Sequence, residues 1–276
     1  MGRGKWAQGI QLSALKLLAA GYDRLHADER GIVILGYHRV GRRTAVRVDL
    51  PEPLFEQQMS LLAEGPGVVD LDSGLASLAD SPPTAREPVV VTFDDGTRDF
   101  VEVALPILVR HRVPATLYVA TEFIETGRLF PNEGSPASWA ALADAVSTGL
   151  VTIGSHTHSH ALLDRVSERI AADELDRSID LIGERLGVQA RHFAYPKAIL
   201  GSALAQQQVR LRFASAAVAG TRPNIYQRTD PWHLNRSPIQ LEDGLRYFER
   251  KVRGGMRLED DLRRLASRRR FASAAS

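Results

Sequence analysis

The sequence predicts an α/β protein in which helices cover the outside of a parallel sheet. Short β-branched runs alternate with segments of helical spacing, and short connections join them, which is typical of repeated strand–helix–strand units. The clearest run is residues 89–93, an apolar stretch short enough for a fully buried strand. A length of 276 residues suits one large α/β domain or two small ones, and barrels of this size are ordinary single domains.

The same patterns, taken along the chain, predict the remaining elements. Buried strands are expected at residues 32–35, 115–120, 151–155 and 213–218. Helices are expected at residues 51–64, 101–112, 138–146 and 167–186, with two amphipathic helices between 241 and 265. Ser138 and Ser167 are candidate N-caps, and Gly149 and Gly187 are candidate helix ends. Pro106 fits the second helix only if it lies in the first turn.

Composition describes a soluble globular protein and excludes several kinds of site. Hydrophobic residues make up 44% of the chain and charged residues 25%, which is enough apolar material for a core. The net charge of +2 gives no electrostatic reason to expect nucleic acid as a partner. Because the chain has no cysteine, disulfides and thiolate ligands are excluded, and any metal must be held by His, Asp or Glu.

The two ends of the chain differ from its middle. Residues 1–30 have an amphipathic helical pattern, without a clear secretory signal, and their apolar stretch is too short to span a bilayer. Residues 241–276 are helical and end in a basic tail. Packing on the domain is the default for the first end and solvation for the second, with peripheral membrane contact through the termini as the alternative. The compartment stays open, and a cytoplasmic or membrane-associated location is favoured.

Two adjacent carboxylates, Asp94 and Asp95, follow the strand at 89–93. Active-site groups of α/β folds lie where strands end, so one carboxylate could bind a metal while the other takes up protons. The alternative is a simple turn, because Asp and Gly are favoured turn residues. His38 follows the strand at 32–35 in the same way, although alone it would suggest a structural histidine.

Three of the eight histidines lie within five residues, directly after the strand at 151–155. His156 and His160 are four apart, so on a helical turn they would share one face and could bind one metal ion. His158 would point elsewhere, and a polar surface turn is the alternative for the whole segment. Two histidines and one carboxylate leave positions for water and substrate, and the second carboxylate could act as general base. This set predicts metal-dependent hydrolysis of an ester or amide.

Three motifs together resemble the polysaccharide deacetylase family, also described as NodB-homology or carbohydrate esterase family 4 proteins. They are Thr-Phe-Asp-Asp-Gly at 92–96, His-Thr-His-Ser-His at 156–160 and Phe-Ala-Tyr-Pro at 193–196, and residues 34–40 resemble the start of the domain. The resemblance covers roughly residues 30–240. It implies a distorted, TIM-barrel-related (β/α) barrel of about seven parallel strands. The expected organisation is a NodB-like deacetylase domain at 31–240, between extensions at 1–30 and 241–276.

The resemblance also implies a reaction, a metal and roles for four residues. The expected reaction removes the acetyl group from N-acetylhexosamine units of a polysaccharide or glycoconjugate, with one divalent ion, usually zinc. Carried over, Asp95, His156 and His160 would be the metal ligands, and Asp94 would be the general base. A related metal-dependent amidohydrolase or esterase with another acyl substrate is the first alternative, and a catalytically weak carbohydrate-binding member is the second.

Two groups depart from the family's usual pattern. Ala194 stands where many members have the arginine that orients the base, so Arg191 or Arg236 would have to replace it. The closing Leu-x-x-His motif that often supplies the general acid is missing, and His38 is the preferred replacement, with His233 second.

Three further residues complete the expected site. The resemblance implies that a backbone N–H near Lys197 would stabilise the oxyanion. Tyr195 and Trp232 are expected to contact the N-acetylated glycan.

Overall fold

A closed barrel of parallel strands forms the centre of the molecule. The computed structural model describes residues 29–65, 67–80, 87–131 and 134–258. Within these ranges seven parallel strands close into a ring in the order β1–β4–β5–β6–β7–β8–β10, and β10 pairs back with β1. Their bounds are β1 (Gly31–Tyr37), β4 (Val89–Phe93), β5 (Ala115–Val119), β6 (Val151–Ser155), β7 (His192–Ala194), β8 (Ser215–Ala219) and β10 (Leu234–Pro238). The predicted barrel is confirmed.

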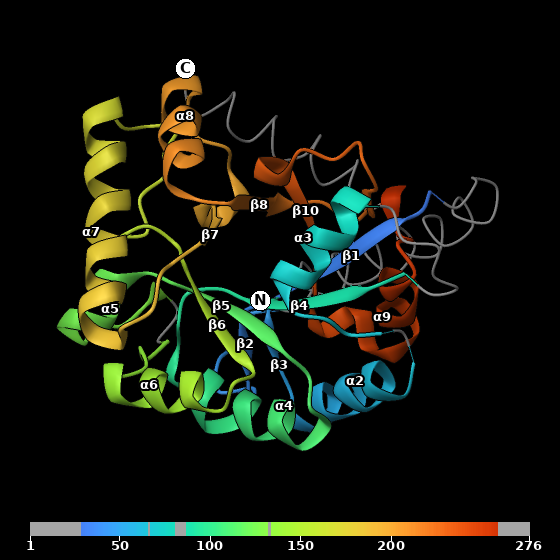
Figure 1. Cartoon of the computed structure of the whole chain (residues 1–276). Helices are drawn as coiled ribbons and strands as arrows, with labels where there is room; N and C mark the ends of the chain where they lie inside the picture. The colour runs from blue at the N-terminus through green and yellow to red at the C-terminus, as the bar shows by residue number, and fades with distance from the viewer. Residues whose placement is uncertain (1–28, 66, 81–86, 132–133, 259–276) are drawn as a thin grey trace, which may run out of the picture.

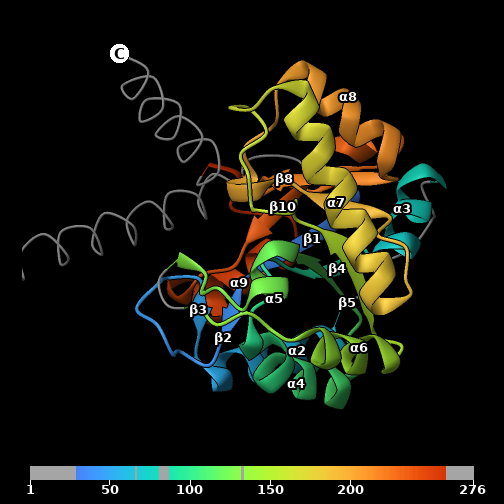
Figure 2. The ribbon, with the colours of Figure 1, turned by 90° about the vertical axis from the view of Figure 1, so that its left-hand side faces the viewer.

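Helices surround this barrel (Figure 1). They are α2 (Glu52–Glu64), α3 (Leu71–Asp80), α4 (Leu105–His111), α5 (Thr121–Thr126), α6 (Trp139–Ser147), α7 (Glu168–Leu186), α8 (Ala203–Arg212) and α9 (Gly244–Val252). The two helices α7 and α8 pack side by side in both views (Figures 1 and 2). Short strands add to the rim: β9 (Asn224–Ile225) pairs antiparallel with β1, and β2 (Arg39–Val40) pairs with β3 (Asp49–Leu50).

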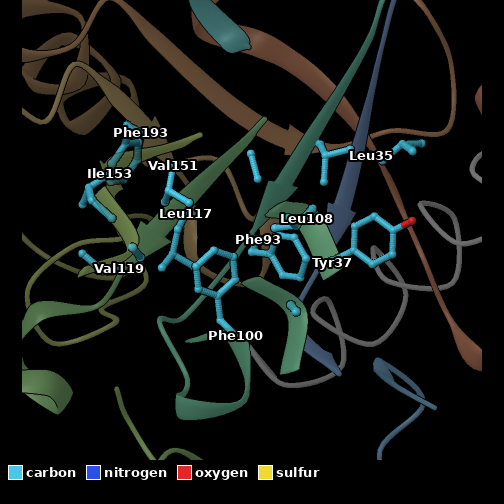
Figure 3. Close-up of a cluster of buried hydrophobic side chains, with 14 of the residues drawn as sticks. Leu35, Tyr37, Phe93, Phe100, Leu108, Leu117, Val119, Val151, Ile153 and Phe193 are labelled. Atoms are coloured by element: carbon cyan, nitrogen blue, oxygen red, sulfur yellow. The ribbon is translucent and has the colours of Figure 1, made fainter. Parts of the chain in front are cut away.

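The outward-facing side chains of the strands pack beneath the helices. Tyr37 stacks on Phe93 with 5.2 Å between ring centroids, and Phe93 meets Phe100 edge-on at 4.9 Å (Figure 3). Aromatic pairs in these geometries add to the stabilisation from area burial. The β-branched and aromatic residues of the predicted strands therefore form the layer between barrel and helices.

The inward-facing side chains form a second apolar cluster, which α3 closes at one end. Leu71 and Leu78 of α3 join the buried residues Ile32 and Val90 of the barrel. Gly74 allows this approach, because a Cβ there would lie 2.9 Å from a methyl of Val90. Since α3 covers the N-terminal end of the strands, the C-terminal end carries the open face.

Most predicted helix signals are found in the structure. The hydroxyls of Ser138 and Ser167 cap α6 and α7, and Gly187 ends α7 with φ +67°. Residues 100–104 form a π-helical turn before α4, which places Pro106 in the first turn of that helix, where it is tolerated. No helix was predicted at α3, α5 or α8. In α8 only Ala205 and Val209 are buried, so its apolar stripe is too narrow to stand out.

The predicted extensions are only partly described. Residues 1–28 and the basic tail at 259–276 lie outside the described residues, so membrane contact through the termini stays a prediction. In the described part of the second extension, α9 packs against α2 and β1. Within the described ranges, no helix has the length and apolar character needed to cross a membrane.

A fully buried ion pair fastens α9 to the barrel. The ammonium of Lys251 donates to the Asp243 carboxylate at 2.8 Å and to the carbonyl of Pro238 at 2.7 Å, and neither charged side chain is exposed. Removing one partner of a buried pair leaves the other charge uncompensated. The pair therefore connects α9 to the end of β10.

Replacing Lys251 with Met is expected to destabilise the protein by about 3–5 kcal/mol, because the buried Asp243 carboxylate would lose the ammonium that donates to it. Urea unfolding measures this free energy. The matched control is Arg253→Met two residues on, which removes an 81% exposed cation and should change stability by no more than about 0.5 kcal/mol. Equal losses in both variants would contradict a special role for the buried pair.

Candidate active site

Asp94 and Asp95 lie in a tight turn at the C-terminal end of β4. The backbone N–H of Asp94 donates to the carbonyl of Tyr37 on the neighbouring β1 at 3.1 Å. Asp95 then has φ +75° and Gly96 φ +88°, so two successive residues are left-handed. Residues other than glycine rarely adopt positive φ values, and those that do are concentrated at functional sites. The turn sends the two adjacent carboxylates in different directions.

The structure brings Asp95, His156 and His160 together. Their potential ligand atoms all lie within 4.8 Å of one another. Asp95 Oδ1 is 3.8 Å from Nε2 of His156 and 3.6 Å from Nε2 of His160. Two ligands bound tetrahedrally to one zinc ion, each about 2.0–2.1 Å from it, would lie about 3.3 Å apart. The spacing is therefore close to that of a three-ligand site.

The chemistry of these groups also suits a divalent ion. Nδ1 of His156 lies 2.7 Å from the carbonyl oxygen of Ala194, which requires the proton on Nδ1 and leaves Nε2 free as a ligand. Burial lowers the pKa of His156, and burial together with the neighbouring His156 lowers the pKa of His160 to about 4. Both rings are therefore neutral near pH 7, which metal binding needs.

The spacing of His156 and His160 predicted that they share one face of a helical turn. In the structure they lie in a loop instead. Residues 156–163 form an irregular loop, in which Thr157 has φ +64° and His160 φ +62°. This reversal, rather than helical periodicity, returns His160 to the same side as His156. His158 points elsewhere, as expected, but into the protein: it is 7% exposed, and its Nδ1 lies 2.9 Å from the hydroxyl of Thr121.

Arg236 on β10 binds the Asp94 carboxylate through both of its terminal nitrogens. The guanidinium donates from Nη1 to Oδ1 and from Nη2 to Oδ2, the latter at 2.9 Å, and both side chains are almost fully buried. Burial alone would raise the pKa of Asp94. The charge of Arg236, with smaller contributions from His156 and His38, outweighs burial and holds the pKa of Asp94 well below its usual range. The carboxylate is thus ionised and fixed in orientation.

Thr92 and Tyr118 support Arg236. Nη1 also donates to the Thr92 hydroxyl at 3.3 Å, and the guanidinium lies over the Tyr118 ring at 5.2 Å from its centroid. A Cβ on Gly154 would come within 2.6 Å of the Tyr118 ring, so glycine makes room for that ring. The signal in the sequence is a glycine inside a predicted strand, which often marks a close approach.

His38 lies on the other side of Asp94. Its Nε2 is 3.7 Å from Asp94 Oδ2, and its side chain is 32% exposed. The imidazole therefore faces the carboxylate and is partly open to solvent.

Arg191 and His233 are not at the site. Arg191 precedes β7 at the opposite end of the barrel and pairs with Asp72 of α3 at 3.2 Å. His233 precedes β10, and its ring nitrogens face Asp230 at 2.9 Å and Gln206 at 3.1 Å. Both residues lie before a strand rather than after it, so neither can orient the base or protonate a leaving group. The expectation of Arg191 or His233 at the site is wrong.

Tyr195 and Trp232 do not present their rings to a substrate. Tyr195 is 1% exposed and packs edge-on against Phe193 in the layer outside the barrel. Trp232 lies at the N-terminal side of β10, donates from Nε1 to the Phe213 carbonyl at 2.8 Å, and is covered by the Arg210 guanidinium. The structure thus contradicts substrate contact by either ring.

Lys197 lies in the segment that follows β7, beside the clustered histidines. Its side chain is exposed, and its charge contributes to the low pKa of His160. Lys197 and Ala198 have φ +52° and +56°, so this turn, like the one at Asp95, has an unusual backbone. The expected position of Lys197 near the site is therefore observed.

Comparisons with known proteins agree with this geometry. The polysaccharide deacetylase family model matches residues 81–215, whereas no curated protein matches the chain. IcaB from Ammonifex degensii superposes with a TM-score of 0.70 at 25% identity, over 82% of this chain and 99% of its own. The deacetylase PplD of Streptococcus pyogenes, solved with acetate, gives 0.69 at 23% identity, over 80% and 98%. Over residues 81–215 the chain is therefore similar to the polysaccharide deacetylases, and it is a hydrolase of carbon–nitrogen bonds other than peptide bonds.

Proposed function

We propose that the protein is a metal-dependent deacetylase that hydrolyses the acetamide of N-acetylhexosamine units in a polysaccharide or glycoconjugate. The family acts by deacetylation of polysaccharides. One observation carries the finer proposal: an ionised carboxylate, Asp94, lies directly beside the Asp95–His156–His160 cluster. A general base next to a three-ligand metal site is the arrangement that amide hydrolysis by water needs.

Asp95, His156 and His160 would hold the ion, and two imidazole donors with one carboxylate suit zinc. When bound, a divalent ion supplies Lewis-acid chemistry: it polarises a carbonyl oxygen and makes water more acidic. Asp94 takes the proton of the attacking water, and Arg236 keeps that carboxylate oriented. A backbone N–H near Lys197 assists the oxyanion.

His38 is the residue that donates a proton to the departing amine. Its Nε2 lies 3.7 Å from Asp94 Oδ2, so a proton accepted by the carboxylate has a short route to the imidazole. The acetate that leaves is the same small acid that was solved with the Streptococcus pyogenes deacetylase.

Replacing Arg236 with Gln is expected to move the acidic limb of the kcat/KM pH profile to higher pH. Burial would then raise the pKa of Asp94 without an arginine to oppose it, so the base would be protonated at a higher pH. In the wild type the pKa of Asp94 is depressed, so the Arg236–Asp94 pair stabilises the fold at pH values above the ordinary pKa of a carboxyl group. This stability is lost as the pH falls through the lowered pKa of Asp94.

The same variant should lose about 3–5 kcal/mol of stability at pH 7, since Asp94 stays buried and charged. The double variant Arg236→Gln/Asp94→Asn removes that uncompensated charge and should be more stable than the single variant. An unshifted acidic limb in Arg236→Gln would contradict the role given to this arginine.

The function is tested by measuring bound metal together with acetate release from several N-acetylated glycans, chitooligosaccharides among them. We expect acetate release that is lost after chelation and restored by zinc or cobalt. Release of another acid would indicate a different acyl substrate. Glycan binding with a full metal site and no acetate release would overturn the proposal.

A further inference from the structure

Helix α7 carries two polar residues on the face that it buries. Its buried positions are Ala171, Glu174, Leu175, Ser178 and Ile182. A carboxylate and a hydroxyl within an apolar stripe are unfavourable unless hydrogen bonds compensate them. Both have partners beside the histidine loop, residues 156–160: the Ser178 hydroxyl lies 2.8 Å from the Ser155 hydroxyl, and Glu174 binds Ser159.

Glu174 directs its whole carboxylate at one residue of the histidine loop. Its Oε2 accepts the backbone N–H of Ser159 at 2.8 Å, and its Oε1 accepts the Ser159 hydroxyl at 2.7 Å. The backbone carbonyl of Glu174 accepts the N–H of His158 at 3.1 Å. Glu174 is 8% exposed, and within the described ranges it forms no ion pair. Its charge is therefore compensated by this loop.

The histidine loop needs such an anchor because its backbone is unusual. Thr157 and His160, on either side of Ser159, both have left-handed φ values, +64° and +62°. Residues other than glycine adopt this conformation only where surrounding contacts enforce it. His156 has a further support in the Ala194 carbonyl, whereas the ring of His160 is partly exposed. Loosening the loop would therefore displace His160 first.

We propose that Glu174 is a positioning residue of the metal site, which holds the histidine loop so that His160 stays beside Asp95. The inference rests on the proposed function, because it assumes that the Asp95–His156–His160 cluster binds a metal ion. Glu174 itself binds Ser159, which is not one of the proposed ligands. Its effect should appear in metal affinity rather than in the base, Asp94, which is held by Arg236 from another strand.

The test compares Glu174→Ala and Glu174→Gln with wild type in zinc dissociation constants, measured by chelator competition. Groups that orient metal ligands typically contribute about 10- to 100-fold in affinity, so Glu174→Ala should bind zinc more weakly by that factor. Gln retains one acceptor oxygen, and its loss should be intermediate. Asp173→Asn, one residue earlier and exposed on α7, is the matched control. A lower melting temperature with unchanged zinc affinity in Glu174→Ala would overturn the proposal.

Amide hydrogen exchange in the zinc-free protein provides a readout that does not depend on metal. In Glu174→Ala the Ser159 N–H should lose protection, whereas the His158 N–H should keep it, because its acceptor is a backbone carbonyl. Equal protection of Ser159 in variant and wild type would overturn the anchoring role. Absence of zinc binding by the wild type would overturn the proposed function, whereas selective loss of Ser159 protection would still support the anchor.

Discussion

Asp94→Asn is expected to lower the kcat for acetate release by about 10²–10⁴-fold, the usual contribution of a general base. The amide has nearly the same shape but cannot accept the proton of the attacking water. Asp94 is not one of the three proposed metal ligands, so bound metal should stay at the wild-type level. Turnover and metal content, measured on the same preparation, separate the two roles of the carboxylate pair.

Two controls accompany this variant. Asp72→Asn changes a carboxylate at the opposite end of the barrel and should leave kcat unchanged. Because Asp94→Asn leaves Arg236 buried without its counter-charge, its unfolding free energy is measured too, and assays are run well below its melting temperature. Near-normal turnover in a folded, metal-loaded Asp94→Asn protein would refute the assignment of the base.

The second large effect is expected from His156→Gln, which should lose most of its bound metal. His156 is 1% exposed, and its Nδ1–H···O=C bond to Ala194 aims Nε2 at Asp95. Removal of a proposed ligand should weaken metal binding by more than the 10- to 100-fold that loss of an orienting group costs. Metal analysis after dialysis against a defined zinc concentration measures the change, and acetate release should fall with metal content.

His233→Gln is the matched control, because this histidine lies at the N-terminal side of β10 among Asp230 and Gln206. Its metal content and activity should equal those of the wild type. If His156→Gln kept its metal while His233→Gln lost it, the ligand set proposed for the C-terminal end of the barrel would be wrong.

The local signals in the chain were sufficient for most of the barrel. Residues 89–93 and 151–155 form β4 and β6 because their apolar runs are short and end in polar residues. Groups that follow parallel strands meet at one end of a barrel, so Asp94, Asp95, His38 and His156 could be expected to share a face. The same rule, applied with strand direction in mind, separates Arg191 and His233, which precede their strands.

The motifs did not show which side of the barrel wall a side chain faces. Tyr195 belongs to a motif beside the site, yet it points outward into the helix layer, whereas Arg236 points inward to Asp94. Successive residues of a strand face opposite sides of the sheet. A shift of one position along the chain therefore moves a side chain from the barrel interior to the layer beneath the helices. The histidine loop also differs from its prediction: a spacing of four favours a helical turn, but contacts with α7 stabilise another backbone conformation.

By itself the sequence determined the strand–helix alternation, the polar residues at strand ends and the carboxylate and imidazole groups available for chemistry, since these depend on local periodicity and residue type. The tertiary structure alone decided which charges meet. Arg236 reaches Asp94 across 142 residues because ring closure places β10 beside β1, and Glu174 reaches Ser159 because α7 packs beside β6. Pairing between distant segments follows from barrel closure and packing, and no local pattern in the chain encodes it.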